Sequence, residues 1–152
     1  MTPDQVTLVQ DSFAKVAPIA TQAGDMFYAR LFEIAPDVRP LFPADISAQR
    51  DKLISMLSTA VTNLHQVQAI IPAVQDLGKR HVGYGVTNAH YDKVGEALLW
   101  TLEKGLGDEF TPPVKQAWTD TYVTLAGVMK DAAATVPAAQ PKKGLFARMF
   151  GT

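Results

Sequence analysis

Residues 27–43 read FYARLFEIAPDVRPLFP, and this stretch decides which kind of fold the chain adopts. Apolar residues recur at helical spacing in its first half. The Ala35-Pro36 step then breaks the helix, because a residue before proline disfavours helical backbone angles. A short piece from Pro36 to Phe42 follows, with prolines bracketing its end. Such a piece fits poorly in a symmetric up-and-down bundle and favours helices that cross at larger angles and leave a pocket between them.

Helical spacing of apolar residues continues over most of the chain in both directions. No alternation typical of strands and no internal repeat interrupts it. Proline, glycine and capping residues divide the chain into successive helices. The expected helix ranges are about 2–16, 18–35, 47–64, 71–83, 88–104 and 111–129. We therefore predict an all-α domain over residues 1–136, with about six or seven helices of unequal length.

The composition excludes several classes of protein. The 152 residues suit a single domain, and 14 basic residues against 15 acidic ones leave a net charge of −1. Without a basic field, nucleic acid is not an expected partner. The absence of cysteine rules out disulfides, cysteine-bound zinc, iron–sulfur clusters and thiol nucleophiles. Neither a signal peptide nor an apolar run of about 18 residues is visible, so we expect a cytoplasmic location.

The last residues, 137–152, are expected to form a Pro/Ala linker followed by a short basic and apolar tail. In a helix, the apolar side chains of the tail would share one face, suited to a membrane surface or to docking on a redox partner. The alternatives are a loose tail or one packed on its own domain. They are favoured, because a helix of about nine residues is marginal in water. The tail residues concerned are Lys142, Lys143, Leu145, Phe146, Arg148, Met149 and Phe150.

His81 is the candidate metal ligand that the helical pattern singles out. It lies one and two helical turns after Leu77 and Val74, and therefore on the apolar face of a short helix. A histidine in such a place is more often a core residue than a ligand. The same geometry also suits a ligand, because a backbone carbonyl near Leu77 can accept the Nδ1 proton and leave Nε2 for a metal. No paired histidines, paired carboxylates or phosphate-binding loops support a hydrolase or a nucleotide-binding protein.

Three further residues stand at positions that permit either a functional or a structural role. Gln49 lies at the edge of an apolar face, where a solvent-facing residue near a helix start is the plain interpretation. Tyr28 sits among apolar residues and is equally compatible with a core aromatic whose hydroxyl reaches a carbonyl or water. Phe42 can simply fill a corner. Taken singly, each structural interpretation is at least as well supported as a functional one.

Taken together, these motifs resemble the globin family over about residues 4–135. FYARLF at 27–32, with the following Ala-Pro step and Leu41-Phe42, resembles the B helix and C–D corner of globins. QRDKL at 49–53 resembles the start of the distal E helix.

The second half of the chain carries two more such motifs. LGKRH at 77–81 resembles the proximal F helix of neuroglobin-like and bacterial globins, and YDKVGEALL at 91–99 resembles the G helix of flavohaemoglobin globin domains. The resemblance implies a globin fold of about six to eight helices around haem b, iron protoporphyrin IX.

The resemblance also implies roles for individual residues. His81 would be the proximal iron ligand, Phe42 would stack on the porphyrin, and Tyr28 and Gln49 would be the polar pair on the distal side. Lys52 or Arg80 would reach a haem propionate, the alternative being an ordinary solvated helix face. The remaining implied pocket residues are Leu53 on the distal side, Val86, Val94 and Leu98 on the proximal and inner sides, and Tyr91 beside the proximal histidine.

A distal Tyr/Gln pair has consequences for gas binding. O2 gains partial negative charge at a haem iron, and the Tyr28 hydroxyl and Gln49 amide can both donate to it. A hydrogen bond to a charged acceptor contributes roughly 1.5–3 kcal/mol, so tight and slow O2 binding with reduced preference for CO is expected. Such a protein suits O2 capture at low O2, or oxidation of NO to nitrate, better than bulk O2 transport. Sulfide and cyanide are further candidate ligands.

The sequence departs from the resembled families at several points. Gln49 stands where a distal histidine would be, which disfavours bis-histidine coordination. His65 lies too far along, about four turns on in the same expected helix. No flavin- and NAD-binding domain follows within the 152 residues, so we expect a single-domain haemoglobin of the Vitreoscilla type, served by an unidentified, separate reductase. Thr135 stands where the family has a glutamate that polarises the proximal histidine through a tyrosine, which argues against peroxidase-like activation and full-speed NO dioxygenation.

Two other classes of function remain as alternatives. The first is a haem-based gas sensor or ligand-binding module without turnover. The second is a haem-free helical interaction protein, which the combination of His81 and Phe42 disfavours.

Overall fold

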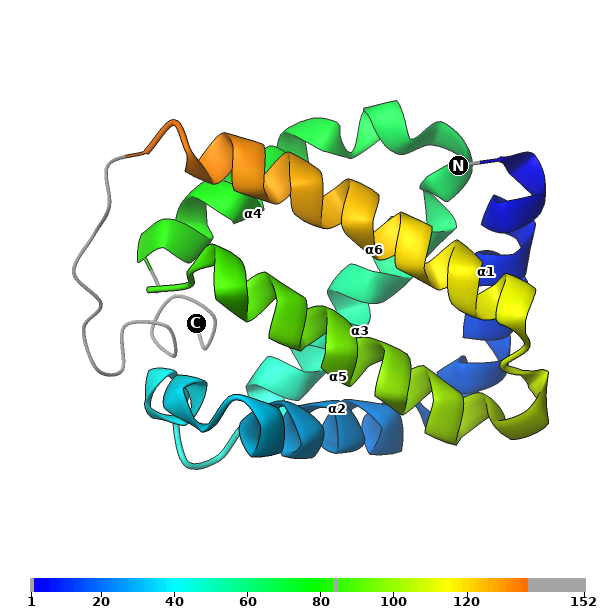
Figure 1. The fold of residues 1–152 in the computed structure, drawn as a ribbon, viewed down its shortest axis with the longest axis horizontal. Helices are drawn as coiled ribbons and strands as arrows, with labels where there is room; N and C mark the ends of the chain where they lie inside the picture. The colour runs from blue at the N-terminus through cyan, green and yellow to red at the C-terminus, as the bar shows by residue number, and fades with distance from the viewer. Residues whose placement is uncertain (1, 84, 137–152) are drawn as a thin grey trace.

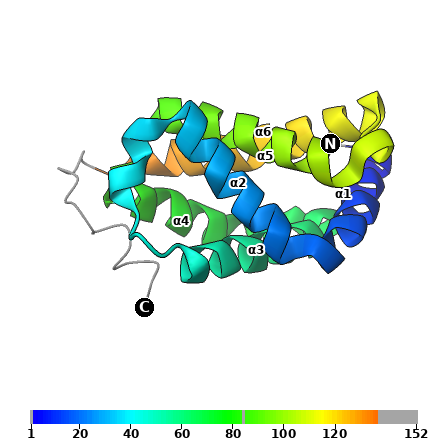
Figure 2. The same ribbon diagram turned by 90° about the horizontal axis from the view of Figure 1, so that it is seen from below.

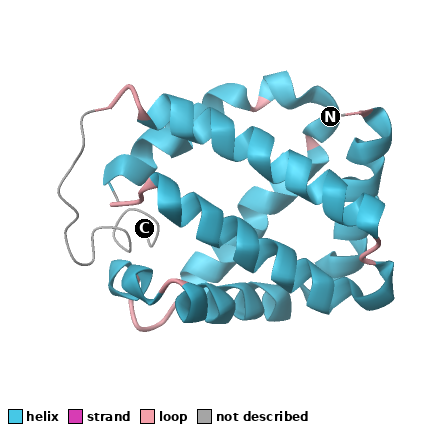
Figure 3. Cartoon of the chain, in the orientation of Figure 1, coloured by secondary structure: helices cyan, strands magenta, loops and turns pink. Residues whose placement is uncertain are grey.

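The computed structural model of the chain describes residues 2–83 and 85–136, so the linker and tail expected at 137–152 lie outside the described residues (Figure 1). The described part consists of helices joined by short loops and turns, with no strand in it (Figure 3). The all-α prediction is therefore confirmed. The α-helices are α1 (Pro3–Val16), α2 (Ala20–Ile34), α3 (Ser47–Thr62), α4 (Ile71–Gly83), α5 (Asn88–Leu106) and α6 (Pro112–Ala133). Short 3-10 helices join them: η1 (Ala17–Ile19), η2 (Pro36–Leu41), η3 (Leu64–Ala69) and η4 (Gly107–Glu109).

The helix boundaries follow the expected breaks closely. Thr2 and Gln5 form a reciprocal cap at the start of α1, each side chain accepting a hydrogen bond from the backbone of the other. Helix α2 ends just before Pro36, and η2 is the short piece that was expected there. One expectation is wrong, because α3 ends at Thr62 and His65 lies in η3, not on α3. The Asn63 side chain donates to the Thr59 carbonyl at 2.8 Å, which satisfies a backbone group at the end of the helix.

The helices cross instead of forming a symmetric bundle. In Figure 1, α5 and α6 run in opposite directions next to each other, while α2 packs on α5 and α4 packs on α6. Figure 2 shows α2 passing obliquely over α3, with which it is also in contact. This arrangement agrees with the large crossing angles expected from the broken helix around Pro36.

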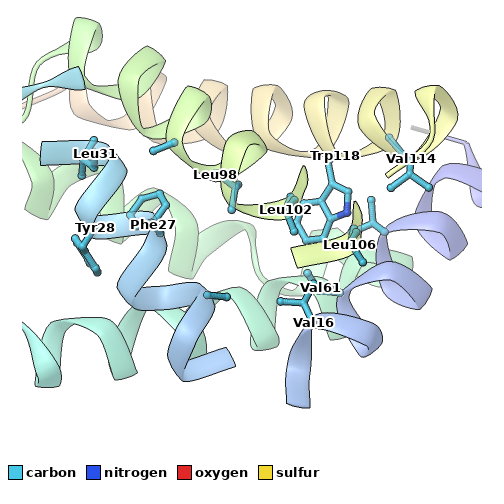
Figure 4. Close-up of a cluster of buried hydrophobic side chains, with 14 of the residues drawn as sticks. Val16, Phe27, Tyr28, Leu31, Val61, Leu98, Leu102, Leu106, Val114 and Trp118 are labelled. Carbon is cyan, nitrogen blue, oxygen red and sulfur yellow. The ribbon is translucent and has the colours of Figure 1, made fainter. Parts of the chain in front are cut away.

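The main hydrophobic core lies between α1, α2, α3, α5 and α6 (Figure 4). Trp118 is 2% exposed, and its indole Nε1 donates to the Ser12 hydroxyl at 2.8 Å. This bond satisfies the one polar atom of the indole inside the core. None of the helices in the described residues combines the length and the hydrophobicity needed to cross a lipid bilayer.

Helix α4 approaches α6 closely because of one glycine. A Cβ built on Gly78 would lie 2.4 Å from the Met129 carbonyl oxygen and 2.6 Å from its Cα. Those are backbone atoms of α6, so they cannot rotate away as the end of a side chain would. The lack of a side chain at Gly78 therefore sets how near α4 comes to α6.

Candidate functional site

His81 lies near the end of α4, and its ring orientation is fixed by its own helix. Its Nδ1 donates to the Leu77 carbonyl oxygen at 2.7 Å. A carbonyl oxygen can only accept, so the proton of the neutral ring sits on Nδ1 and the lone pair on Nε2. This confirms the hydrogen bond expected from the sequence and gives the ring the tautomer that ligates metals through Nε2.

Burial keeps the His81 ring uncharged. The burial lowers the pKa of His81 to about 4, and the hydrogen bond to Leu77 opposes this shift only in part. The imidazole is therefore neutral near pH 7, which is the charge state that metal binding requires.

Tyr91 lies against His81 from the neighbouring helix α5. The two rings are stacked, with centres 6.3 Å apart and planes at 27°. The backbone carbonyl of Tyr91 accepts a hydrogen bond from the Tyr122 hydroxyl at 2.6 Å. The Tyr91 hydroxyl itself is buried and has no hydrogen-bond partner among the described residues. Burial raises the pKa of Tyr91 to about 12, so this phenol stays neutral.

Tyr28 and Gln49 form a buried polar pair contributed by α2 and α3. Their exposed fractions are 4% and 5%, so the interpretation of Gln49 as a solvent-facing residue is wrong. The helix that begins at Ser47 turns Gln49 inward onto α2, which its position at the edge of the apolar face left undecided. Burial raises the pKa of Tyr28 above its usual range, and a side-chain hydrogen bond with Gln49 opposes the rise. Tyr28 therefore keeps its proton and remains a hydrogen-bond donor.

Phe42 connects this polar pair with the helix that carries His81. Its ring meets the Tyr28 ring edge-on, with centres 5.6 Å apart. Phe42 also belongs to an apolar cluster with Leu41, Leu77 and Val86. Since Leu77 is the residue that binds His81 Nδ1, the structure brings Tyr28, Phe42 and the surroundings of His81 into one continuous region.

Arg39 and Asp37 hold in place the short helix η2, which leads into Phe42. Arg39 in η2 donates to the Pro43 carbonyl at 2.9 Å and the Ala44 carbonyl at 3.2 Å, and its guanidinium lies over the Phe32 ring at 4.7 Å. Asp37, also in η2, accepts a hydrogen bond from His90 Nε2 at 2.9 Å.

The hydrogen bond between His90 and Asp37 joins η2 to the start of α5. His90 Nδ1 accepts from the Thr87 backbone N–H at 3.1 Å, so the same ring caps the helix and binds Asp37. These bonds tie the turn after α2 to the segment that follows Val86.

Other residues expected at the site have different surroundings. Leu98 is buried in the main core, with Leu53 and Val94 packed against it. Lys52 is half-buried on α3. Arg80 is exposed and forms an ion pair with Asp76 at 2.7 Å, one helical turn away. That pairing agrees with the interpretation of Arg80 as part of a solvated helix face.

Thr135 stands where the resemblance to globins implies a glutamate beside the proximal histidine. It is exposed beyond the end of α6, and its hydroxyl donates to the Ala132 carbonyl at 2.7 Å. The Thr135 hydroxyl is therefore directed to the end of its own helix.

A small apolar cavity lies in the main hydrophobic core. Its volume is about 30 Å³, and its lining includes Phe27, Leu53 and Leu98. One water-sized sphere takes up roughly 10–15 Å³ by this measure, so the space admits molecules of a few atoms only.

Three residues near His81 were missed by sequence reasoning. Gly78 sets the approach of α4 to α6, Tyr122 holds the Tyr91 backbone, and Lys130 places its ammonium group 5.6 Å from the centre of the Tyr91 ring. Each acts across two helices. The apolar spacing within one helix gives no signal for such contacts.

The donor set fits a cofactor that brings its own metal. In the described residues, no three His, Asp or Glu side chains come together as a site that could hold a metal ion. A single neutral imidazole next to aromatic and apolar side chains instead suits a metal that is already held by an organic ring. The buried Tyr28–Gln49 pair adds hydrogen-bonding capacity to an otherwise apolar region.

Comparison with known proteins gives an independent result. A protein-family model described as Globin matches residues 25–129. A flavohemoprotein of Bacillus subtilis (strain 168) is 33% identical over 125 residues, covering 75% of this chain and 31% of the relative. A flavohemoprotein of Xylella fastidiosa (strain 9a5c) is 30% identical over 139 residues, covering 89% of this chain and 34% of the relative. The chain thus spans about a third of the length of the curated relatives it matches.

Proposed function

The chain belongs to the globin family, and from this premise we propose that it binds haem b through His81 and holds O2 beside Tyr28 and Gln49. Haem-based gas binding is the general function that the family and the flavohemoprotein relatives support. The observation that carries the more specific proposal is the neutral His81 imidazole. Its Nδ1 proton is held by the Leu77 carbonyl in the orientation that a proximal ligand needs.

The cofactor we propose is held without a covalent bond to the chain. The sequence contains no cysteine, so the thioether attachment of c-type haem has no residue to form on. His81 would ligate the iron, while Phe42, Leu77 and Val86 would contact the porphyrin ring. Lys52, which is half-buried on α3, or Arg80, which is exposed on α4, would reach a haem propionate. When bound, haem supplies an iron atom that binds diatomic gases reversibly.

Tyr28 and Gln49 determine which gas is held most tightly. Both side chains are buried and both can donate a hydrogen bond to a partly negative oxygen atom. Tyr28 stays protonated because burial raises its pKa. CO carries less negative charge and gains less from these donors, so the pair favours O2 over CO. NO, sulfide and cyanide are the other small ligands that we include in the proposal.

Oxidation of NO is the turnover reaction that we propose for this site. NO, O2 and one electron together give nitrate, so each cycle needs an electron from a reductase outside the described residues. Thr135 offers no carboxylate, its hydroxyl donates to the Ala132 carbonyl, and the Nδ1 atom of His81 donates to the Leu77 backbone carbonyl. A carbonyl makes the imidazole less electron-rich than a carboxylate would, which favours gas holding with slow turnover.

Tyr28→Phe tests the role of the polar pair. A hydrogen bond to a charged acceptor contributes about 1.5–3 kcal/mol, so its loss should raise the O2 dissociation rate of the haem-loaded protein by about tenfold to a hundredfold. Stopped-flow displacement of O2 by excess CO measures this rate. Tyr122→Phe is the matched control, since it also removes a buried tyrosine hydroxyl, but one that contacts the Tyr91 carbonyl.

The outcomes separate the proposal from its alternatives. An O2 dissociation rate that changes no more in Tyr28→Phe than in Tyr122→Phe would rule out the hydrogen-bonding role of Tyr28. Nitrate formation from NO in the presence of a general electron donor supports turnover. Stable O2 binding without nitrate formation would instead favour a gas-binding module without turnover.

A further inference from the structure

Lys130 lies behind the residue that stacks on His81. Its Nζ is 5.6 Å from the centre of the Tyr91 ring, and the Tyr91 ring is stacked on the His81 ring at 6.3 Å. The three residues come from α6, α5 and α4 in that order. They form a stack of a cation, an aromatic ring and the imidazole that we propose as the iron ligand.

The middle of this stack is held firmly in place. Tyr122 donates to the Tyr91 carbonyl at 2.6 Å. Gly95, on the next turn of α5, leaves room for the Tyr122 ring, because a Cβ there would lie 2.8 Å from that ring. The backbone of Tyr91 is therefore fixed on α6, and its ring is buried, with 6% of the residue exposed.

The middle of the stack also carries no charge that would cancel the cation. The Tyr91 hydroxyl is buried, with no hydrogen-bond partner among the described residues, and an ordinary phenol carries no charge near pH 7. Asp92 Oδ1 lies 3.9 Å from Lys130 Nζ; the Asp92 side chain is 77% exposed and that of Lys130 is 34% exposed. An ion pair of that length at an exposed carboxylate offsets the positive charge only in part.

We propose that Lys130 is a positioning residue that acts through Tyr91 by holding a positive charge behind His81, and that it thereby favours the reduced state of the haem iron. The inference rests on the proposed function, because it requires haem on His81. A nearby positive charge disfavours the more positive ferric state relative to the ferrous state. Only the ferrous state binds O2, so the device would keep the protein ready to bind gas.

The structure sets the size of the effect. With the ammonium 5.6 Å from the Tyr91 ring centre and that centre 6.3 Å from the His81 ring centre, the cation is at most about 12 Å from the imidazole. An iron bound to Nε2 would lie about 3 Å beyond the ring centre, so about 15 Å from the cation at most. At that distance, effective dielectric constants of roughly 40 and 20 give a change of about 2.5-fold to sixfold in the ferrous-to-ferric ratio. Tenfold corresponds to about 59 mV for one electron, so the expected shift is roughly 25–50 mV.

Four variants of the haem-loaded protein test the proposal by redox titration of the midpoint potential. Lys130→Met removes the charge but keeps a flexible apolar stem over Tyr91, and should lower the potential by roughly 25–50 mV. Lys130→Arg keeps the charge and should restore the potential. Asp92→Asn removes the opposing anion and should raise it. Lys104→Met is the control, because Lys104 lies in the same way over Trp100, at 5.8 Å, near the other end of α5.

The pattern of signs distinguishes a charge effect from a packing effect. If Lys130 only packs on Tyr91, Lys130→Met leaves the potential where Lys104→Met leaves it, and the inference is wrong. If Lys130→Met does not fold, Asp92→Asn decides alone, since an unchanged or lowered potential in that variant contradicts the proposed sign. If the unaltered protein takes up no haem, or takes it up without His81, the proposed function fails and this inference fails with it. Normal haem uptake without the shift overturns the inference alone.

Discussion

Replacing Gly78 with alanine places one methyl group where α4 meets α6. The new Cβ would lie 2.4 Å from the Met129 carbonyl oxygen, 2.6 Å from its Cα and 2.9 Å from its carbonyl carbon. Ordinary contacts begin near 3.4 Å, so one helix must move by about 1 Å. Both sides of the contact are helical backbone, and α6 is itself fixed in the core through Trp118. The strain cannot be relieved by rotating a side chain.

The expected loss of stability follows from two opposing effects. Alanine gains about 1 kcal/mol over glycine inside a helix. Overpacking in a well-packed interior costs about 1–3 kcal/mol, and occasionally more where backbone must shift. A rigid contact belongs at the upper end, so we expect a net loss of about 2 kcal/mol in the free energy of unfolding. For a chain of this size, that lowers the melting temperature by about 4–8 °C.

Gly127→Ala is the matched control on the partner helix. Gly127 lies in α6, two residues from Met129, and a Cβ built there meets nothing within 4 Å. It should stabilise the protein by up to about 1 kcal/mol, since only the helix propensity changes. Thermal unfolding followed by circular dichroism compares both variants with the unaltered protein. A Gly78→Ala protein as stable as Gly127→Ala would refute the claim that this close approach positions α4.

Two further outcomes follow from the polar contacts. The His90 hydrogen bond lowers the pKa of Asp37, so its contribution to stability is present above the pKa of the unfolded chain and is lost as the pH falls through the folded pKa. Asp37→Asn should therefore lower the melting temperature near pH 7 and make no difference in acid, as a melting series against pH will show. Because CO gains little from hydrogen bonds, Tyr28→Phe should leave the CO dissociation rate within about twofold while the O2 rate rises, and flash photolysis or ligand replacement measures both.

The features that the sequence predicted well are those encoded within single helices. The break at Ala35-Pro36 follows from proline chemistry, and the hydrogen bond from His81 Nδ1 to the Leu77 carbonyl follows from one turn of helix. The end of α3 at Thr62 was not predicted, since no proline or glycine marks it.

Contacts between helices could not be predicted in the same way. Whether Gln49 faces solvent or α2 depends on how α3 crosses α2, and the apolar spacing on one helix does not fix that crossing. The same holds for Gly78 against Met129 and for Lys130 over Tyr91, which join helices far apart in the sequence. Resemblance to globins supplied the grouping of His81 with Tyr28 and Gln49, which periodicity alone left open.

The most direct test of the account is a haem titration followed by absorption spectroscopy. We compare the unaltered protein with His81→Gly and with His65→Gly, a histidine in η3 that the account gives no role in haem binding. One haem per chain should bind tightly to the unaltered protein and to His65→Gly, with a sharp Soret band. His81→Gly should lose this tight binding, and added imidazole should restore it. An undiminished Soret band in His81→Gly, or none in the unaltered protein, would contradict the claim that His81 is the haem ligand.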